Sequence, residues 1–328
     1  MNPVTAAMTV MLATTVSLAT AAPKGKSVPG PEFPAGMAAR PTNKPVQKKM
    51  IEPGVTYYAC HFKNLGDGPV ATHWLVIEWE KVAKGVSLNI SRNPERRERP
   101  TTLAETVKPI ACVNGTYHST VDPSIPFYQL KVRGEMIPSQ STGGDCAMAF
   151  NKGEMPVIGP CTKDWLDTYE NVISGDGISG FHVPFADYYK DQTPEGKSKR
   201  ENGRAPRTFA GNNVSNKWTV IGIADGRQPG HSIGVNFQEI CYMLVDEWGC
   251  DNKQVVSFDG GGSTMMAIKK GGNVEVVNRP SDGAPKRPTE RRVAESIQIV
   301  NAKSHPDVPV KGAKKAKKGK DDGKGKKK

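Results

Sequence analysis

The 328-residue sequence lacks the features that would place it in several large protein classes. Beyond its N-terminal segment it has no long run of consecutive apolar residues, so we expect no membrane span. It has no Cys-x-x-Cys pair and no Cys/His cluster with zinc-site spacing, so we expect neither a metal nor a cofactor. The glycines at 260–262 are not followed by lysine, which excludes a P-loop there, and they do not place Ser263 in a Gly-x-Ser-x-Gly elbow.

The net charge of +12 is unevenly distributed along the chain. Residues 311–328 contain ten Lys and two Asp, a net of +8, so most of the excess lies in one short segment. A run of Lys and Gly without aromatic residues cannot form a core, and we expect residues 303–328 to be a disordered, Lys-rich tail. Such a tail favours loose contact with a polyanion, but without stacking aromatics it does not make the chain a nucleic-acid-binding protein.

The N-terminus indicates export. Residues 1–22 form an apolar run that ends in Ala-Thr-Ala-Ala, which is typical of a signal peptide cleaved near Ala22, although no Lys or Arg precedes it. Residues 23–48 are rich in Pro, Gly and Lys, as a linker would be. The six cysteines fit a secreted or periplasmic protein, where an even count indicates disulfide bonds.

Strand-like segments separated by glycine turns dominate residues 49–302, for example at 86–91. One helix is expected over residues 236–249, because Asn236 is placed as its N-cap and Glu239 follows three residues later, as in a capping box. The pattern predicts a single β-rich domain of the mixed α/β (α+β) class with few helices.

Three segments share a pattern in which an apolar strand ends in a polar residue and glycine. They are Val113-Asn114-Gly115, Ala224-Asp225-Gly226-Arg227 and Phe258-Asp259-Gly260-Gly261-Gly262-Ser263. Each corner alone is an ordinary turn, because Asp-Gly and Gly-Gly are common turn dipeptides. Three of them could converge on one polar pocket, where glycine lets backbone N–H groups approach an anion and arginine adds paired donors for phosphate.

The ordered motifs VNGTY, ENGRAPRTFAG, ADGRQPGHSIGVNFQEI, VSFDGGGSTMM and NRPSD…ERRVA resemble the phosphodiester glycosidase family over residues 53–302. The resemblance implies a secreted catalytic domain that cleaves a sugar from a sugar-1-phosphodiester, with a phosphorylated glycan as its partner. The family's polar motif residues fall on Asn114, Arg207, Asp225, Arg227, Asp259, Ser263 and Arg279. Thr116 stands where a second glycine is usual and His118 where an aromatic residue is usual, and both would reshape the first corner.

We interpret Asp259, Asp225 and His118 as candidate catalytic residues. The candidate substrate-binding residues are Asn114, Gly115, Arg207, Arg227, Gly260, Gly261, Gly262, Ser263 and Arg279. A phosphate monoester is a good leaving group, so the site needs cations or N–H donors on phosphate and a carboxylate beside an oxocarbenium-like centre. Arg207 or Arg227 with Asp259 would supply this pairing. The alternative is a non-catalytic module that binds phosphorylated glycans through the same groups.

Overall fold

The computed structural model describes residues 31–306, with gaps at 67, 83–84, 142–145, 183–202 and 285–286. The predicted signal peptide at 1–22 and residues 307–328 of the predicted tail lie outside the described residues. Residues 303–306 of that tail are described, and His305 is buried there, so the folded part extends beyond residue 302.

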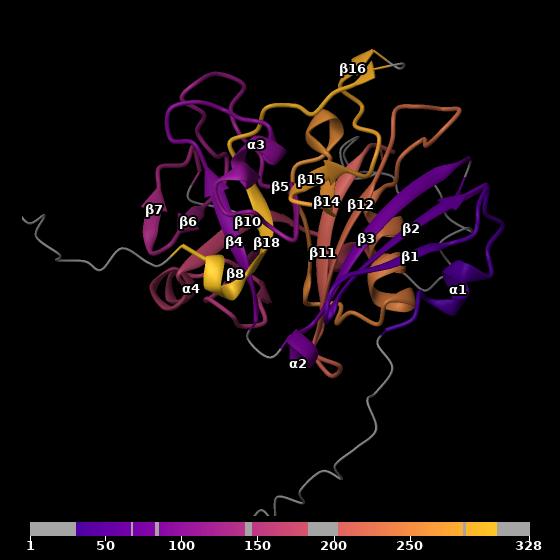
Figure 1. The fold of residues 1–328 in the computed structure, drawn as a ribbon, viewed down its shortest axis with the longest axis horizontal. Coiled ribbons are helices and arrows are strands. Elements are labelled where there is room, and N and C mark those ends of the chain that lie inside the picture. Colours follow the sequence, from indigo (N-terminus) through magenta and orange to yellow (C-terminus); the bar gives the residue numbers. More distant parts are fainter. Residues whose placement is uncertain are drawn as a thin grey trace, which may run out of the picture. The chain divides into compact units, whose positions relative to one another are not determined.

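The described chain forms two large antiparallel β-sheets, of which the larger has eleven strands. Nine of them follow one another in the order β1-β2-β3-β12-β11-β13-β10-β6-β7, while β8 pairs with β10 and β9 with β8 (Figure 1). Their bounds are β1 Gln47–Glu52, β2 Val55–Phe62, β3 Val70–Glu78, β6 Leu130–Val132, β7 Glu135–Ile137, β8 Cys146–Phe150, β9 Val157–Gly159, β10 Asn171–Gly177, β11 Arg207–Asn213, β12 Trp218–Ala224 and β13 Val255–Ser257.

The smaller sheet has five strands in the order β15-β14-β5-β18-β4. Their bounds are β4 Val86–Arg92, β5 Ala111–Asn114, β14 Met266–Lys270, β15 Asn273–Val276 and β18 Glu295–Asn301. A two-stranded ribbon, β16 (Gly283–Ala284) and β17 (Arg287–Pro288), interrupts the path from β15 to β18. Since β13 is in the larger sheet and β14 in the smaller, the segment between them, which holds Asp259, crosses from one sheet to the other.

The described helices are all short. They are α1 (Ala35–Ala38), α2 (Trp79–Val82), α3 (Pro100–Glu105), α4 (Lys163–Thr168), α7 (Phe237–Cys241), the π-helix η2 (Tyr242–Glu247) and the 3₁₀ turns η1 (Ser179–Phe181), η3 (Gly261–Ser263) and η4 (Ala302–Ser304). Within the described residues, no helix is long and apolar enough to cross a membrane. The predicted β-rich, mixed α/β (α+β) class with few helices is confirmed.

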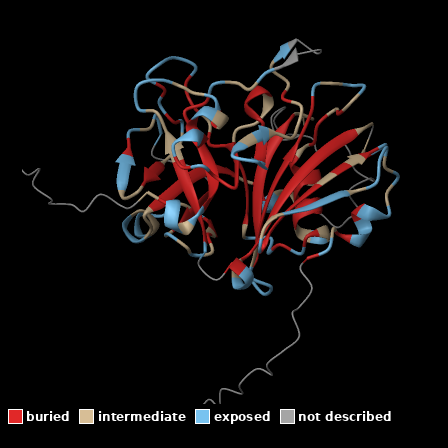
Figure 2. Cartoon of the chain, viewed as in Figure 1, coloured by how far each residue is buried: buried red, intermediate tan, exposed pale blue. Residues whose placement is uncertain are grey.

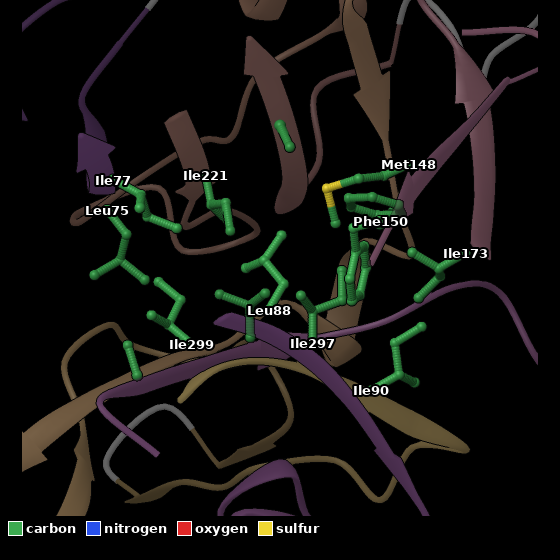
Figure 3. Packing of buried hydrophobic residues seen from close by; sticks show 14 of the residues in the cluster. Leu75, Ile77, Leu88, Ile90, Met148, Phe150, Ile173, Ile221, Ile297 and Ile299 are labelled. Carbon is green, nitrogen blue, oxygen red and sulfur yellow. The ribbon is translucent and has the colours of Figure 1, made fainter. Parts of the chain in front are cut away.

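The main hydrophobic core lies between the two sheets. Leu75 and Ile77 of β3 and Ile221 of β12 meet Leu88 of β4 and Ile299 of β18 in one buried cluster (Figure 3). The central strands of the larger sheet are buried along most of their length (Figure 2), and all nine residues of β3 are buried. A strand that is covered on both faces has apolar residues at consecutive positions, as β3 does at Trp74-Leu75-Val76-Ile77.

A second core covers the opposite face of the larger sheet, beneath α7 and η2. Trp74 and Val76 alternate with Leu75 and Ile77 along β3 and therefore point away from the smaller sheet. Trp74 packs against Trp248, with the two ring centroids 5.7 Å apart. The domain thus has three layers: the smaller sheet, the larger sheet and the helical segment.

The segment 31–46, predicted as part of a linker, packs against this second core. The side chain of Met37 is fully buried there. The ring of Phe33 packs against Trp248, with centroids 5.8 Å apart. The folded domain therefore begins before residue 49, because two apolar side chains anchor a segment whose overall composition is that of a linker.

The predicted helix begins where the sequence indicates. Asn236 Oδ1 accepts from the Glu239 N–H at 2.9 Å, and the Glu239 carboxylate accepts from the Asn236 N–H at 3.0 Å, which confirms the capping box. The α-helical part ends at Cys241 and continues as the π-helix η2, so the segment is not the uniform helix that we predicted.

Replacing Asn236 with Ala is expected to lower the free energy of unfolding by about 1 kcal/mol, because the Glu239 N–H loses its acceptor at the start of α7. Urea unfolding of the wild type and of Asn236→Ala measures the difference. Asn216→Ala, in an exposed turn between β11 and β12, is the matched control. Equal losses in both variants would show that the cap contributes nothing specific.

The cysteines do not form the disulfide bonds that we predicted. All six lie in the described part of the chain, and none is in a disulfide. Five are buried: Cys60, Cys112, Cys146, Cys241 and Cys250. They lie in separate segments of the chain and pack as small apolar side chains in the cores. Burial raises the pKa of the Cys60 thiol to about 12, which disfavours the thiolate that disulfide formation requires.

Candidate active site

Asp259 lies just after β13, against the corner that ends β5. Asn114 Nδ2 donates to the Asp259 carbonyl at 2.7 Å, and the Asp259 N–H donates to the Gly115 carbonyl at 3.1 Å. Asn114 Oδ1 accepts from Thr208 Oγ1 at 2.7 Å and from the Met265 N–H at 3.2 Å. Two of the three predicted corners therefore converge. Asn114, predicted to bind substrate, is fully buried and ties the two sheets together at this point.

The glycines after Asp259 form a tight turn that has no room for side chains. Gly261 has a φ of 62°, and its N–H donates to the Pro206 carbonyl at 2.8 Å. A Cβ on Gly260 would lie 2.6 Å from the Pro206 carbonyl oxygen, and one on Gly262 would lie 2.0 Å from Asp282 Oδ1. Glycine is needed here for backbone conformation and close approach, and the turn presents main chain to the space beside Asp259.

That space, the arginine–glycine hollow, has a volume of about 490 Å³. It is lined by Tyr117, Gly203, Arg204, Ala205, Arg207, Arg227, Asp259, Gly260, Gly261, Gly262 and Arg291. Arg204 is ion-paired with the buried Glu239, and the Arg207 guanidinium lies 4.6 Å from the centroid of the Phe237 ring. The Arg227 guanidinium lies beside Gly261. Since Arg204 and Arg291 are paired with Glu239 and Asp282, the positive charge of this hollow comes from Arg207 and Arg227, and it suits a phosphate.

A second space, the His118 hollow, also contains Asp259 and has a volume of about 510 Å³. It is lined by Arg97, Tyr117, His118, Thr120, Phe127, Asp259, Ser263, Asp282, Arg291 and Arg292. His118 Nδ1 lies 3.8 Å from Asp259 Oδ2. Burial lowers the pKa of His118 below its usual range, so its imidazole is neutral at neutral pH. Ser263 Oγ is buried and has no hydrogen-bond partner among the described residues.

Asp225, predicted to be catalytic, lies in a third place, the histidine cavity, of about 260 Å³. Its carboxylate is 2.9 Å from His231 Nε2 and accepts from Asn278 Nδ2 at 2.8 Å and from the Arg279 N–H at 3.0 Å. Only 1% of Asp225 is exposed. Asp225 and Arg279 line neither hollow beside Asp259, so the structure separates these two predicted residues from the others.

Arg227 follows Asp225 by two residues and does reach the arginine–glycine hollow. Its backbone has a φ of 59°, in the left-handed region that a residue other than glycine adopts only when its surroundings hold it there. The fixed carboxylate of Asp225 anchors the start of this turn. The second corner therefore contributes one residue to the site and one to its support.

The histidine cavity also contains His61, His73 and His231, a cluster that the scattered sequence positions concealed. Tyr57 Oη lies 2.7 Å from His73 Nδ1. Burial lowers the pKa of His73 to about 4, although the nearby Asp225 carboxylate opposes this effect. No three His, Cys, Asp or Glu side chains in the described part of the chain are placed to hold a metal ion.

The sequence contains one Gly-x-Ser-x-Gly pattern, at residues 230–234. Ser232 Oγ donates to the Asp225 carbonyl at 2.6 Å and accepts from the Ala71 N–H at 3.1 Å. Ser232 is fully buried, whereas the serine of a nucleophile elbow is exposed at the top of a sheet. The pattern is therefore a structural link between the second corner and β3.

Tyr117 and Arg291 line both hollows but were not predicted as site residues from the sequence. Tyr117 Oη donates to Asp176 Oδ2 at 2.7 Å, and Arg291 donates to both oxygens of Asp282 at 2.7 and 2.8 Å. Tyr117 belongs to the motif VNGTY and Arg291 to ERRVA, but neither residue was taken as a site residue. Their place inside those motifs was the available signal.

In this β-rich domain the Asp259 carboxylate therefore lies between the arginine–glycine hollow and the His118 hollow. The chain belongs to the phosphodiester glycosidase family, whose model matches residues 108–300, more than half of the chain. This match confirms the resemblance seen in the motifs. No curated protein matches the chain.

Several solved structures share the fold. The catalytic domain of zebrafish N-acetylglucosamine-1-phosphodiester alpha-N-acetylglucosaminidase, auto-inhibited by its pro-peptide, is 19% identical, with a TM-score of 0.57 over 80% of this chain and 86% of that chain. A presumed exported protein from Burkholderia pseudomallei is 12% identical, with a TM-score of 0.60 over 82% of this chain and 99% of that chain. A hypothetical protein from Synechocystis is 13% identical, with a TM-score of 0.54 over 78% and 64%. At these identities the likeness shows the fold alone.

Proposed function

We propose that this chain is a hydrolase that releases a sugar from a sugar-1-phosphodiester. One observation carries the proposal: Asp259 is shared by the arginine–glycine hollow and the His118 hollow. A phosphate fits the first hollow, because guanidinium groups and main-chain donors bind phosphate oxygens. A sugar ring fits the second, where aromatic, hydroxyl and carboxylate side chains lie together and where Arg97 and Arg291 are ion-paired with Asp122 and Asp282. The bond that joins sugar to phosphate would then lie at Asp259.

Cleavage at this position follows from the charges around it. Arg207 and Arg227 neutralise the phosphate monoester as it leaves, so the leaving group needs little proton donation. The Asp259 carboxylate stabilises the positive charge that develops on the sugar, as nucleophile or as base toward water. The reaction splits the sugar–oxygen bond and adds water across it.

His118 and Asp225 have different roles in this proposal. A neutral imidazole 3.8 Å from Asp259 Oδ2 is able to take a proton from the attacking water or to pass it on, so we assign proton transfer to His118. Asp225 does not line the hollows, and we assign it the positioning of Arg227 through the turn that it anchors.

The test uses the purified full chain and a panel of sugar-1-phosphodiesters, with aryl glycosides of the same sugars as controls. The name of the zebrafish relative makes the methyl ester of N-acetylglucosamine 1-phosphate the first substrate to try. We expect sugar release from phosphodiesters and little from aryl glycosides. Binding of a phosphorylated glycan without any release would instead favour the non-catalytic binding module.

We also propose that the chain is exported and acts in a secreted or periplasmic location, on the basis of the signal-like pattern at residues 1–22. N-terminal sequencing of the protein recovered outside the cytoplasm should begin near Pro23. Recovery of the chain with Met1 intact and only in the cytoplasm would contradict export.

A further inference from the structure

Glu295 is a buried carboxyl group behind the site that the sequence reasoning did not single out. It is the first residue of β18 and is 0% exposed. Its Oε1 accepts from the Thr116 N–H at 2.8 Å, and its carbonyl accepts from the Gly115 N–H at 3.2 Å. Glu295 therefore holds the corner after β5 through both its side chain and its main chain.

The same corner holds Asp259. The Gly115 carbonyl accepts from the Asp259 N–H at 3.1 Å, so Glu295 and Asp259 bind the corner from opposite directions. A Cβ on Gly115 would lie 2.8 Å from Glu295 Oε1, which shows how closely the carboxyl packs on the corner. The Glu295 carboxyl and the Asp259 main chain are therefore connected through one short peptide segment, Gly115–Thr116.

The surroundings of Glu295 suit an uncharged acid. Its Oε2 is buried and has no hydrogen-bond partner among the described residues, an arrangement that would be costly for a carboxylate. Burial disfavours the ionised form most strongly, and the Asp259 carboxylate acts in the same direction. The hydrogen bond from the Thr116 N–H and the charge of Arg92 on β4 favour ionisation, but burial outweighs them and raises the pKa of Glu295 to about 8. The group is protonated at neutral pH and ionises just above it.

We propose that Glu295 is a positioning residue for Asp259, which its uncharged carboxyl keeps in place through the Gly115–Thr116 corner, and that its ionisation disables the site. Glu295 lines neither hollow, so it acts through the corner and does not touch the substrate. Losing the proton would place a second negative charge behind Asp259, with Arg92 as the cation that acts on it. The inference rests on the proposed function, because the site it controls is the proposed catalytic one.

The test compares the pH dependence of kcat and KM in the wild type and in Glu295→Gln, which stays uncharged and keeps an acceptor for the Thr116 N–H. We expect the wild type to lose kcat as the pH rises through about 8, and Glu295→Gln to keep it for at least about one further pH unit. Near pH 6 the two proteins should agree within about threefold in kcat. Glu290→Gln, in the same segment but outside both hollows, should keep the wild-type alkaline limit.

An unchanged alkaline limit in a folded Glu295→Gln protein would overturn the proposal. So would inactivity of this variant near pH 6, because the charge state of Glu295 would then not be what matters.

A second measurement does not depend on activity. The carboxyl ¹³C resonance of Asp259 should respond to the ionisation of Glu295 in the wild type, and this response should be absent in Glu295→Gln. If the wild type cleaves no phosphodiester but the response is seen, the proposed function fails while the coupling stands. If the response is absent in the wild type, the coupling itself is refuted.

Discussion

Replacing Asp259 with Asn is expected to lower kcat for sugar-1-phosphodiesters by at least about 100-fold, the scale seen when one preorganised electrostatic group is removed. The substitution keeps the size of the side chain but removes the negative charge that stabilises the oxocarbenium-like centre. The hydrogen bonds that hold the main chain of residue 259 involve its N–H and carbonyl, and Asn retains both. The measurement is steady-state release of sugar, together with thermal unfolding to show that the fold is unchanged.

Asp251→Asn provides the matched control, since this exposed carboxylate accepts from the Val214 N–H at 2.8 Å and lies outside both hollows. It should retain the wild-type kcat. A folded Asp259→Asn protein with near wild-type turnover would mean that Asp259 is only the first residue of a turn. The proposed mechanism would then lose its central group.

The parts of this molecule that could be predicted from sequence are those whose causes are local. The capping box of Asn236 and Glu239 depends on a spacing of three residues, and the structure forms it as expected. The turn after Asp259 depends on consecutive glycines, and Gly261 does adopt a positive φ. A strand that runs into such a turn presents its last polar side chain at the end of the sheet, which is where Asp259 lies.

What could not be predicted depends on partners far apart in the chain. Asp225 and Asp259 each follow an apolar strand and precede glycine. The Asp225 carboxylate accepts hydrogen bonds from Asn278 and Arg279, whereas the Asp259 carboxylate faces two hollows. Only the pairing of β12 with β3 brings His73 to the cavity where Asp225 lies. Similar local patterns therefore give one residue that supports the site and one that faces it.

The burial of Glu295 could not be predicted from the sequence either. Glu295 follows three residues after a run of charged residues, Glu290 to Arg292, that is typical of a surface segment. Ser296-Ile297-Gln298-Ile299 alternates polar and apolar residues, a pattern that indicates a half-exposed strand. In the structure β18 is buried on both faces as far as Val300, so the local pattern gives no sign that Glu295 is buried.

Replacing Arg227 with Asn is expected to lower kcat/KM for sugar-1-phosphodiesters by roughly 10- to 150-fold, the equivalent of about 1.5–3 kcal/mol for a hydrogen bond to a charged group. The Arg227 guanidinium lies beside Gly261 in the arginine–glycine hollow, where the proposal places phosphate. Asn is chosen because residue 227 has a φ of 59°, which Asn tolerates better than Ala does. Any residual cleavage of aryl glycosides should change little, since these substrates carry no phosphate.

The matched control is Arg133→Asn, because Arg133 also has a left-handed backbone, with a φ of 49°, but lies in the turn between β6 and β7 and lines neither hollow. Each substitution removes one arginine from a position with a left-handed backbone, so a general effect of net charge or of turn strain would appear in both variants. We expect only Arg227→Asn to discriminate phosphodiesters from aryl glycosides. Equal losses on both substrate classes would show that Arg227 supports the fold of the hollow and does not bind phosphate, and the phosphate would then have to be reassigned to the arginines of the His118 hollow.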